Sequence, residues 1–248
     1  TNYPRILLMT RKSFFFIFIF FSTLFYIALS TKADITTGLV AHYKLDESSG
    51  TTAADSSSNG NTGTLINGPT WTTGKIGNAL NFDGVNDYVD SSGTVTTVDS
   101  ISVSAWVKPT AFSCSGVCTI VKLGDQSNTT GYHWLYAYDG LLAWQYTNGT
   151  TYTAKTVSAT LPLSQWSLIS VTHDYASKTV RFYVNGALVS TQTHTDAVQP
   201  INQSVRVGAY IASVHQWNGA IDDVRIYNRA LTAQEVTDLY NLGIATPT

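Results

Sequence analysis

The sequence predicts an all-β fold in which two antiparallel sheets pack face to face, with one short C-terminal helix. Three observations support this prediction: short apolar runs alternate with polar residues, Gly, Asn, Asp and Ser separate the runs, and no strand–helix–strand rhythm occurs. Alternation with a period of two is typical of antiparallel strands that bury one face. Many short strands at regular spacing favour a two-sheet sandwich.

Eleven segments show this alternation clearly. In the segment 101–107, the apolar side chains at positions 101, 103, 105 and 107 share one face. Asn185-Gly186 separates two of the segments, and both residues accept a positive φ, so we expect a two-residue type I′ turn there. The predicted strands are residues 39–45, 79–82, 101–107, 119–123, 132–138, 141–145, 167–173, 179–184, 187–193, 204–208 and 220–227.

A single helix is predicted over residues 233–241. Thr232 and Glu235 have the Thr-x-x-Glu spacing of a capping box, and Leu231 can pack on Val236 as a hydrophobic staple. We expect this helix to close one end of the sandwich.

Residues 1–33 have the composition of an export signal. Arg11 and Lys12 precede an uncharged run over residues 13–29, and small residues up to Ala33 offer a cleavage site. An uncleaved membrane anchor is the alternative, because the run is near the lower limit of about 17 residues for a bilayer span. Residues 1–8 precede Met9, the only methionine, and are interpreted as lying upstream of the true start.

The mature domain is therefore expected over residues 34–243, with residues 244–248 beginning a linker or tail. After Ala33 the chain contains ten basic and sixteen acidic residues, a net charge of −6. This balance disfavours nucleic acid as a partner, whereas neutral polysaccharide and Ca²⁺ remain compatible with it. We expect a secreted or cell-surface protein that touches the membrane only if its leader stays uncleaved.

Cys114 and Cys118 are the only cysteines, and they stand four positions apart. In an exported protein this spacing favours a local disulfide that holds a loop. A redox or metal pair is the alternative, but the spacing is not Cys-x-x-Cys and no second pair completes a zinc site.

Asp46 and Asp55 flank a loop rich in Ser, Gly and Asn, and Asp222 stands near the other end of the chain. Calcium takes six to eight oxygen ligands, many of them backbone carbonyls, so these three aspartates are candidate ligands of a structural Ca²⁺. The alternative is a solvated loop of Asx turns with no metal.

Aromatic residues in predicted loops are candidates for sugar binding. Tyr210, His215 and Trp217 precede the last strand, and loops carry function more often than strands do. Aromatic rings suit amphipathic ligands such as sugars. Tyr132, at the start of an aromatic-rich strand, is a further candidate.

Three tryptophans at strand positions, Trp106, Trp134 and Trp144, are expected to lie in the core instead. The loop 124–131 adds Asp125 and Asn128, whose short polar groups suit sugar hydroxyls directly or through a bound calcium.

Catalysis is not expected. Glycoside hydrolysis usually needs two carboxyl groups that flank the scissile bond, yet Glu47 and Glu235 are the only glutamates and Glu235 caps the helix. Asp222 and Asp223 point to opposite faces of a strand unless a bulge intervenes. A hydrolase with an aspartate-based site remains the alternative.

Three stretches together resemble the laminin G-like domains, which are concanavalin A-like jelly rolls. They read VAHYKLDESSG at 40–50, GNALNFDGVNDYV at 77–89 and NGAIDDVRIYNRAL at 218–231, and the likeness extends from Gly38 to Asn241. The resemblance implies a two-sheet jelly-roll sandwich whose first and last strands lie together, which would bring the Asp46 loop beside Asp222.

Related laminarinase-type glucanases carry a calcium-binding aspartate at a position similar to Asp222. Their catalytic glutamates lie on a central strand that has none here, so the activity does not transfer. Pentraxin-like relatives bind calcium through a loop that resembles Asp125–Asn128, but their second, acidic loop has no carboxylate counterpart in residues 210–217.

The sequence thus predicts a secreted, non-catalytic, lectin-like carbohydrate-binding or adhesion module with a structural calcium. Two alternatives stay open: an appendage of, or fragment from, a polysaccharide-degrading hydrolase, and an extracellular protein–protein interaction domain. Fold alone does not separate these functions.

Overall fold

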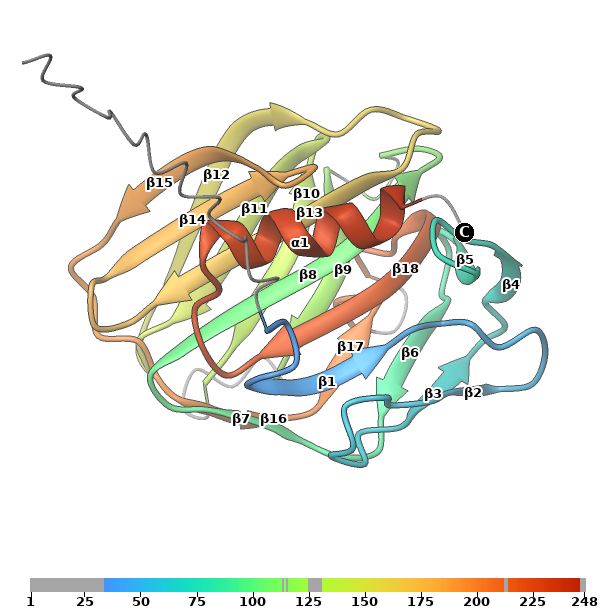
Figure 1. The fold of residues 1–248 in the computed structure, drawn as a ribbon, viewed down its shortest axis with the longest axis horizontal. Helices are drawn as coiled ribbons and strands as arrows, with labels where there is room; N and C mark the ends of the chain where they lie inside the picture. Colours follow the sequence, from blue (N-terminus) through green and yellow to red (C-terminus); the bar gives the residue numbers. More distant parts are fainter. Residues whose placement is uncertain (1–33, 113, 115, 125–130, 212–213, 246–248) are drawn as a thin grey trace, which may run out of the picture. The chain divides into compact units, whose positions relative to one another are not determined.

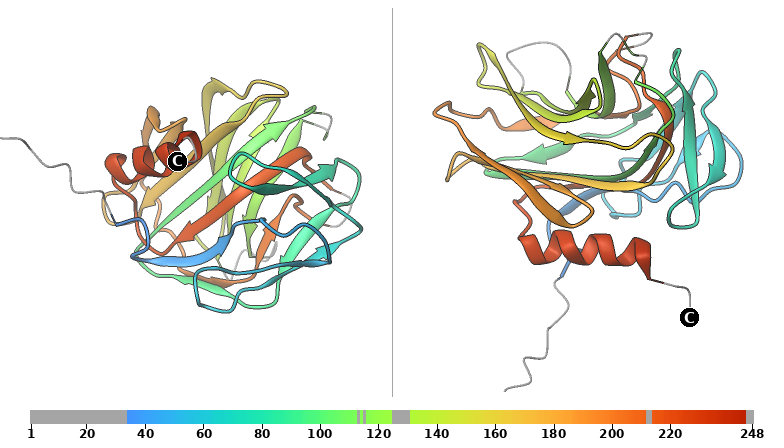
Figure 2. Two further views of the ribbon diagram at one scale, coloured as in Figure 1. Left: turned by 45° about the vertical axis from the view of Figure 1, so that its right-hand side comes forward. Right: turned by 90° about the horizontal axis from the view of Figure 1, so that it is seen from above.

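Two antiparallel sheets stack on each other in the computed structural model, and the one helix of the described residues lies outside them (Figures 1 and 2). The structure describes residues 34–112, 114, 116–124, 131–211 and 214–245. The predicted leader, residues 1–33, lies outside the described residues, as do Asp125, Asn128 and the end of the predicted tail.

The first sheet is built around its longest strands, β8 (Ser100–Pro109) and β18 (Asn218–Tyr227). Along one edge of β18, β5 pairs with the first half of the strand and β1 with the second half, so the first and last strands of the domain lie together, as predicted. The remaining members are β15 (Ala187–Thr193), β14 (Thr179–Val184), β13 (Ser167–Asp174), β5 (Asn78–Asp83), β4 (Thr70–Thr73) and β1 (Leu39–Tyr43).

The second sheet has the order β12-β11-β10-β9-β17-β6-β3-β2. A separate two-stranded ladder joins β7 (Val95–Thr97) and β16 (Ile201–Gln203). The strands of the second sheet are β12 (Tyr152–Thr160), β11 (Leu141–Thr147), β10 (His133–Tyr138), β9 (Val117–Leu123), β17 (Val205–Val207), β6 (Tyr88–Ser91), β3 (Gly63–Ile66) and β2 (Thr52–Ala53).

The main core fills the space between the sheets. Ile101, Val103, Ala105 and Val107 of β8 all belong to it, which confirms the predicted face. Trp106, which lies between them in sequence, points to the other side and joins a second cluster. Because β8 is central and covered on both faces, nearly every residue in it is buried.

The helix α1 (Ala233–Ile244) covers the outer face of the first sheet (Figure 2). The predicted capping box is present, with Thr232 and Glu235 each accepting a backbone N–H from the other. The expectation that the helix closes an end of the sandwich is wrong. Trp106, Leu168, Tyr183 and Tyr227, from four adjacent strands, form an apolar patch there, and α1 packs Val236 and Leu239 against it.

Two local predictions are also confirmed. Asn185 and Gly186 have φ values of 51° and 78° in the hairpin between β14 and β15, and Asn185 Oδ1 accepts the Leu168 N–H. Cys114 and Cys118 form a disulfide with a Cα–Cα distance of 5.3 Å. No helix in the described part of the chain is long and apolar enough to span a membrane.

Candidate functional site

The outer face of the second sheet carries an aromatic cluster that is separate from the main core. In β10, Leu135 and Ala137 point into the main core, so Trp134 and Tyr136 point outward. We call the set Tyr132, Trp134, Tyr136, Tyr210 and His215 the aromatic face.

Trp134 is the centre of this aromatic face. Its ring lies 4.2 Å from that of Tyr136 and 4.4 Å from that of Tyr210, centroid to centroid, and 5.7 Å from His215. Its Nε1 donates to Thr119 Oγ1 on the neighbouring strand at 3.1 Å, which satisfies the only polar atom of the indole. Tyr210 and His215 therefore lie over Trp134 on the outer face of the sheet.

Lys122 ties this covering segment to β9. Its Nζ donates to the Tyr210 carbonyl at 2.8 Å and lies 4.8 Å from the centre of the Tyr210 ring. Lys122 is buried, so its ammonium group faces little solvent. Its hydrogen bond holds the backbone of Tyr210 close to β9.

A row of polar side chains continues from Trp134 across the sheet. Residues directly opposite each other in antiparallel strands share a face. The register places Trp134 opposite Lys122, Lys122 opposite Arg206, and Arg206 opposite Asp90. We call these four residues, with Gln145 opposite Trp134 and Thr64 opposite Asp90, the cross-strand row.

Arg206 is the most constrained charge of the cross-strand row. Its Nε and Nη2 donate to the two oxygens of Asp90 at 2.8 and 2.6 Å, and its guanidinium lies 4.5 Å from the Tyr88 ring centre. These hydrogen bonds raise the pKa of Arg206 above its usual value. The pair is half-buried, so part of each group still reaches solvent.

The predicted ligand residues have different fates. The structure brings Tyr132, Tyr210 and His215 together: the Tyr132 and Tyr210 rings are 6.2 Å apart, and those of Tyr210 and His215 are 5.6 Å apart. Tyr132 is only 1% exposed and lies beneath the others. Asp125 and Asn128 lie outside the described residues.

Trp217 contradicts its prediction as a surface residue. It is 1% exposed and belongs to the main core. Its backbone N–H donates to the Gly208 carbonyl at 2.8 Å, so the backbone at Trp217 is hydrogen-bonded to the end of the segment that contains β17. The tryptophans expected in the core, Trp106, Trp134 and Trp144, are all buried.

Sequence reasoning missed Lys122, Arg206 and Asp90 as parts of the site. A signal was present for the two basic residues: each is the one charge within a short apolar strand, in TIVKL and VRV. The cross-strand alignment that joins them depends on pairing between β9 and β17, which are far apart in sequence.

Asp55 holds a turn. Its carboxylate accepts the backbone N–H groups of His42, Ser57 and Asn61 at 2.8–2.9 Å and the Ser57 hydroxyl at 2.9 Å. Burial alone would raise the pKa of Asp55, but these donors hold it below its usual value. Asp55 thus has the arrangement of the Asx-turn alternative.

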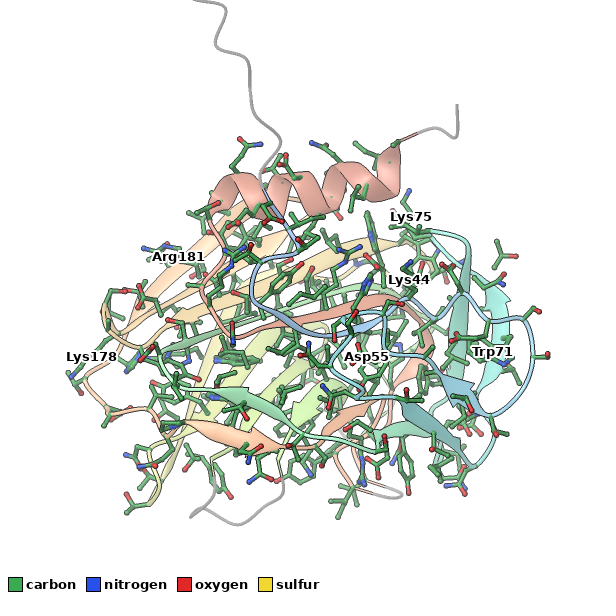
Figure 3. All side chains as sticks on the ribbon, turned by 60° about the horizontal axis from the view of Figure 1, so that its bottom comes forward. Lys44, Asp55, Trp71, Lys75, Lys178 and Arg181 are labelled. Carbon is green, nitrogen blue, oxygen red and sulfur yellow. A yellow bond between two sulfur atoms is a disulfide. The ribbon has the colours of Figure 1, made fainter. Side chains whose placement is uncertain are left out.

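Asp222, in β18, and Asp46, which follows β1, both contact the turn that leads from β4 into β5. Asp222 Oδ2 accepts the N–H groups of Lys75 and Ile76 at 2.8 Å each, and Asp46 Oδ1 accepts the Asn78 N–H at 3.1 Å. Lys75 and Asp55 are well separated in Figure 3, so Asp55 lies apart from this turn. Among the described residues, no three His, Cys, Asp or Glu side chains form a group that could hold a metal.

Asp222 is an unusual carboxylate. It is fully buried, its Oδ1 has no hydrogen-bond partner in the part of the chain that the structure describes, and burial together with the neighbouring Asp223 raises its pKa to about 7. A buried carboxylate oxygen without a partner is costly, so this atom suits a proton or a cation.

Asp223 has a different environment. β18 contains a bulge between Asp222 and Arg225, and Asp223 has a φ of 46°. Its carboxylate accepts from His42 Nε2 at 2.7 Å and Arg225 Nε at 3.0 Å. Burial opposes ionisation, but these partners keep its pKa below the usual value. Both aspartates are buried, so the bulge does not turn them into a pair that faces an open groove.

Comparison with known families gives one match: a family model described as the concanavalin A-like lectin/glucanases superfamily matches residues 83–237. No curated protein matches the chain.

Several solved structures share the fold. Domain 4 of AbnA, a GH43 extracellular arabinanase from Geobacillus stearothermophilus, solved in complex with arabinotriose, is 25% identical with a TM-score of 0.66. That alignment covers 82% of this chain and 98% of that domain. The receptor-binding domain of botulinum neurotoxin type G is 16% identical, with a TM-score of 0.64 over 83% of this chain.

The binding domain of botulinum neurotoxin serotype D, in complex with N-acetylneuraminic acid, is 15% identical with a TM-score of 0.64 over 83% of this chain. The alignment covers 51% of each toxin domain, so the chain corresponds to about half of their length.

Proposed function

The chain belongs to the concanavalin A-like lectin/glucanase superfamily, and from this premise we propose that it is a non-catalytic module that binds a neutral polysaccharide. The observation that carries the proposal is the aromatic face with its cross-strand row on the outer side of the second sheet.

The chemistry of this surface suits sugars. A sugar ring presents apolar C–H faces and polar hydroxyl edges, and aromatic rings with a polar rim complement both. Tyr210 and His215 supply partly exposed rings, and Gln145, Arg206 and Asp90 supply donors and acceptors along the row. The strands hold these side chains rigidly, which lowers the entropic cost of binding.

The comparison with AbnA supports the same proposal. The alignment with this chain spans 98% of domain 4 of that arabinanase, and the structure of that domain contains arabinotriose. Arabino-oligosaccharides are therefore the first ligands to test. A module attached to a polysaccharide-degrading hydrolase is one setting for this function. The disulfide between Cys114 and Cys118 supports a location outside the reducing cytosol.

The placement of the two glutamates supports binding over hydrolysis. Glu235 caps α1 and accepts from Arg229 at 2.6 and 2.9 Å, while Glu47 Oε1 accepts the Ala54 N–H at 2.8 Å. Neither belongs to the aromatic face or to the cross-strand row. Incubation of the pure protein with the bound polysaccharide should therefore release no reducing ends.

Titration calorimetry with arabinotriose and a panel of neutral oligosaccharides tests the sugar site. We expect Tyr210→Ala and Arg206→Gln to weaken binding at least tenfold, about 1.4 kcal/mol, because they remove a stacking ring and a polar anchor. Tyr210→Phe should keep most of the affinity. Leu188→Ser, on the exposed edge strand β15, is the matched control that leaves binding unchanged.

Binding of wild-type protein to none of these sugars at millimolar concentration would refute the proposed function. A protein partner recovered by the same surface, without competition from sugars, would favour the interaction-domain alternative.

We also propose a structural Ca²⁺ at the β4–β5 turn. Asp222 fits a ligand because its buried Oδ1 has no hydrogen-bond partner among the described residues, and Asp46 contacts the same turn through the Asn78 N–H. Asp55 does not fit, since protein donors already reach both of its oxygens. When bound, the ion would neutralise Asp222 and hold the turn against β18.

Thermal unfolding in calcium and in EGTA tests this site. We expect calcium to raise the Tm of the wild type by several degrees, since a ligand at about 100 times its Kd adds about 2.7 kcal/mol. Asp222→Asn should fold and lose this calcium response. Asp55→Asn should be less stable in both buffers but keep the response. Equal wild-type Tm values in calcium and EGTA would rule the site out.

A further inference from the structure

A polar pocket lies away from the aromatic face, where β1 of the first sheet approaches β7. Its volume is about 260 Å³, and none of its lining residues belongs to the aromatic face or the cross-strand row. Val40 and Val95 supply its apolar part, and every other lining residue is an asparagine or a threonine. None of the described residues that line it carries a charge.

Asn61 forms the most rigid part of the pocket. It is 2% exposed, its Nδ2 donates to the Val40 carbonyl at 2.8 Å, and its N–H donates to Asp55 Oδ2 at 2.9 Å. Its carbonyl accepts the Tyr43 hydroxyl at 2.6 Å. Its side-chain oxygen, Oδ1, is left without a hydrogen-bond partner among the described residues.

Asn59 repeats this arrangement one position along β1. Its Nδ2 donates to the Leu39 carbonyl at 3.1 Å, so the two amides bind successive carbonyls of β1. Asn59 Oδ1 also has no partner in the part of the chain that the structure describes. The same wall of the pocket thus presents two acceptors whose orientation β1 determines.

The opposite wall comes from β7. Thr94 and Thr96 are exposed, and their hydroxyls both donate to Asn202 Oδ1, at 2.7 and 3.1 Å. Because each hydroxyl proton is already donated to Asn202, the two threonine oxygens can act only as acceptors towards a ligand. Asn228 adds an exposed amide to the lining.

We propose that this pocket binds a single unit of a neutral sugar, as a second subsite of the carbohydrate-binding function proposed above, on which it rests. Sugar hydroxyls are donors, and the two walls present uncharged acceptors. The absence of a lining charge leaves anionic and cationic ligands without a counter-charge. The pocket is smaller than the roughly 300–1,000 Å³ of sites for drug-sized ligands, so one ring fits better than a chain.

Titration of wild-type protein with neutral pentoses and hexoses, one at a time, and then with arabinotriose tests this subsite. The double variant Thr94→Val/Thr96→Val removes both hydroxyls with little change of shape. Asn228→Trp replaces a lining residue with a bulky side chain that occupies the pocket. Both should weaken monosaccharide binding at least tenfold while the Tm stays near that of the wild type. Leu188→Ser, on the exposed edge strand β15 and outside both the pocket lining and the aromatic face, should leave monosaccharide binding unchanged.

Monosaccharide affinity that stays within twofold of wild type in both pocket variants would overturn the subsite. Binding of arabinotriose without binding of any monosaccharide would also overturn it and leave the proposed function standing. Failure of wild-type protein to bind any sugar would refute both proposals.

Discussion

Trp217 illustrates how the role of one side chain depends on its tertiary environment. A tryptophan in a predicted loop suggests a ligand contact, but this one fills the main core behind the aromatic face. The residues before it, Tyr210 and His215, do lie on the surface of the second sheet. Exposure changes within this short segment because the chain returns to the sandwich as β18 begins.

Replacing Trp217 with alanine should therefore act on stability. Removal of a buried tryptophan typically costs about 3–5 kcal/mol, a large share of the roughly 5–15 kcal/mol of a folded domain. Urea unfolding measures this loss, and Trp217→Phe should lose much less. A Trp217→Ala protein of unchanged stability but weakened sugar binding would contradict the assignment.

His173 and His194 form a hydrogen-bonded pair whose tautomers follow from their partners. Trp144 Nε1 donates to His173 Nδ1 at 3.2 Å, so His173 carries its proton on Nε2 and donates it to His194 Nε2 at 2.9 Å. His133 Nε2 lies 2.7 Å from the Tyr175 hydroxyl, and its ring stacks on Trp144. The acceptor roles of His173 Nδ1 and His194 Nε2 require neutral rings for these two histidines.

At the scale of the element, α1 shows how a local signal and a non-local surface combine. The capping box sets where the helix begins, and the sequence contains all of it. The surface that receives the helix comes from Trp106, Leu168, Tyr183 and Tyr227 on four strands. Their outward positions are apolar because α1 covers them, and alternation along one strand does not reveal this.

The cap can be tested by substitution. Thr232→Ala removes the acceptor of the Glu235 N–H and should cost about 1 kcal/mol, while Thr232→Ser keeps the acceptor and should be close to wild type. Urea unfolding followed by circular dichroism measures both. A Thr232→Ala variant as stable as the serine variant would mean that the capping box adds nothing.

The strands that sequence analysis missed share a physical cause. All eleven predicted strands are present, two of them with the predicted ends (β14 and β15) and nine with shifted ends, but β2, β3, β4, β6, β7, β12 and β16 were not predicted. Most of these have two to four residues, too few for a periodic signal. β12 is longer, but only Val157 in it is buried, so an edge strand rich in Thr and Ala shows no apolar face.

At the scale of the whole molecule, three apolar clusters hold the layers together. The main core joins the sheets, the second cluster joins α1 to the first sheet, and the third contains the buried rings of the aromatic face. The third cluster is covered by Tyr210 and His215, whose rings are partly exposed, and binding is proposed there.

The buried histidines make the stability of the fold depend on pH. Burial lowers the pKa of His133 to about 3 and that of His173 to about 2, from 6.5 in the unfolded chain. Below pH 6.5 the unfolded chain binds protons that the folded chain does not. Stability should be complete above pH 6.5 and fall by up to about 1.4 kcal/mol per pH unit for each histidine as the pH drops.

Urea unfolding between pH 7.5 and 4.5 measures this dependence, in a range where most carboxylates stay ionised. His133→Gln should be less stable at pH 7.5 but show a shallower loss towards pH 4.5. An unchanged slope in this variant would mean that His133 takes up its proton without unfolding.

The sequence by itself determined the local structure: the strand alternation, the type I′ turn at Asn185-Gly186, the capping box and the Cys114–Cys118 loop. Each depends on residues a few positions apart, whose φ preferences and hydrogen-bonding groups act wherever the chain lies. Tertiary structure alone decided the burial of Trp217, the turn-holding role of Asp55, the partnerless oxygen of Asp222 and the row from Trp134 to Asp90. These depend on strand register and on which surfaces meet, and both arise from contacts between residues far apart in the chain.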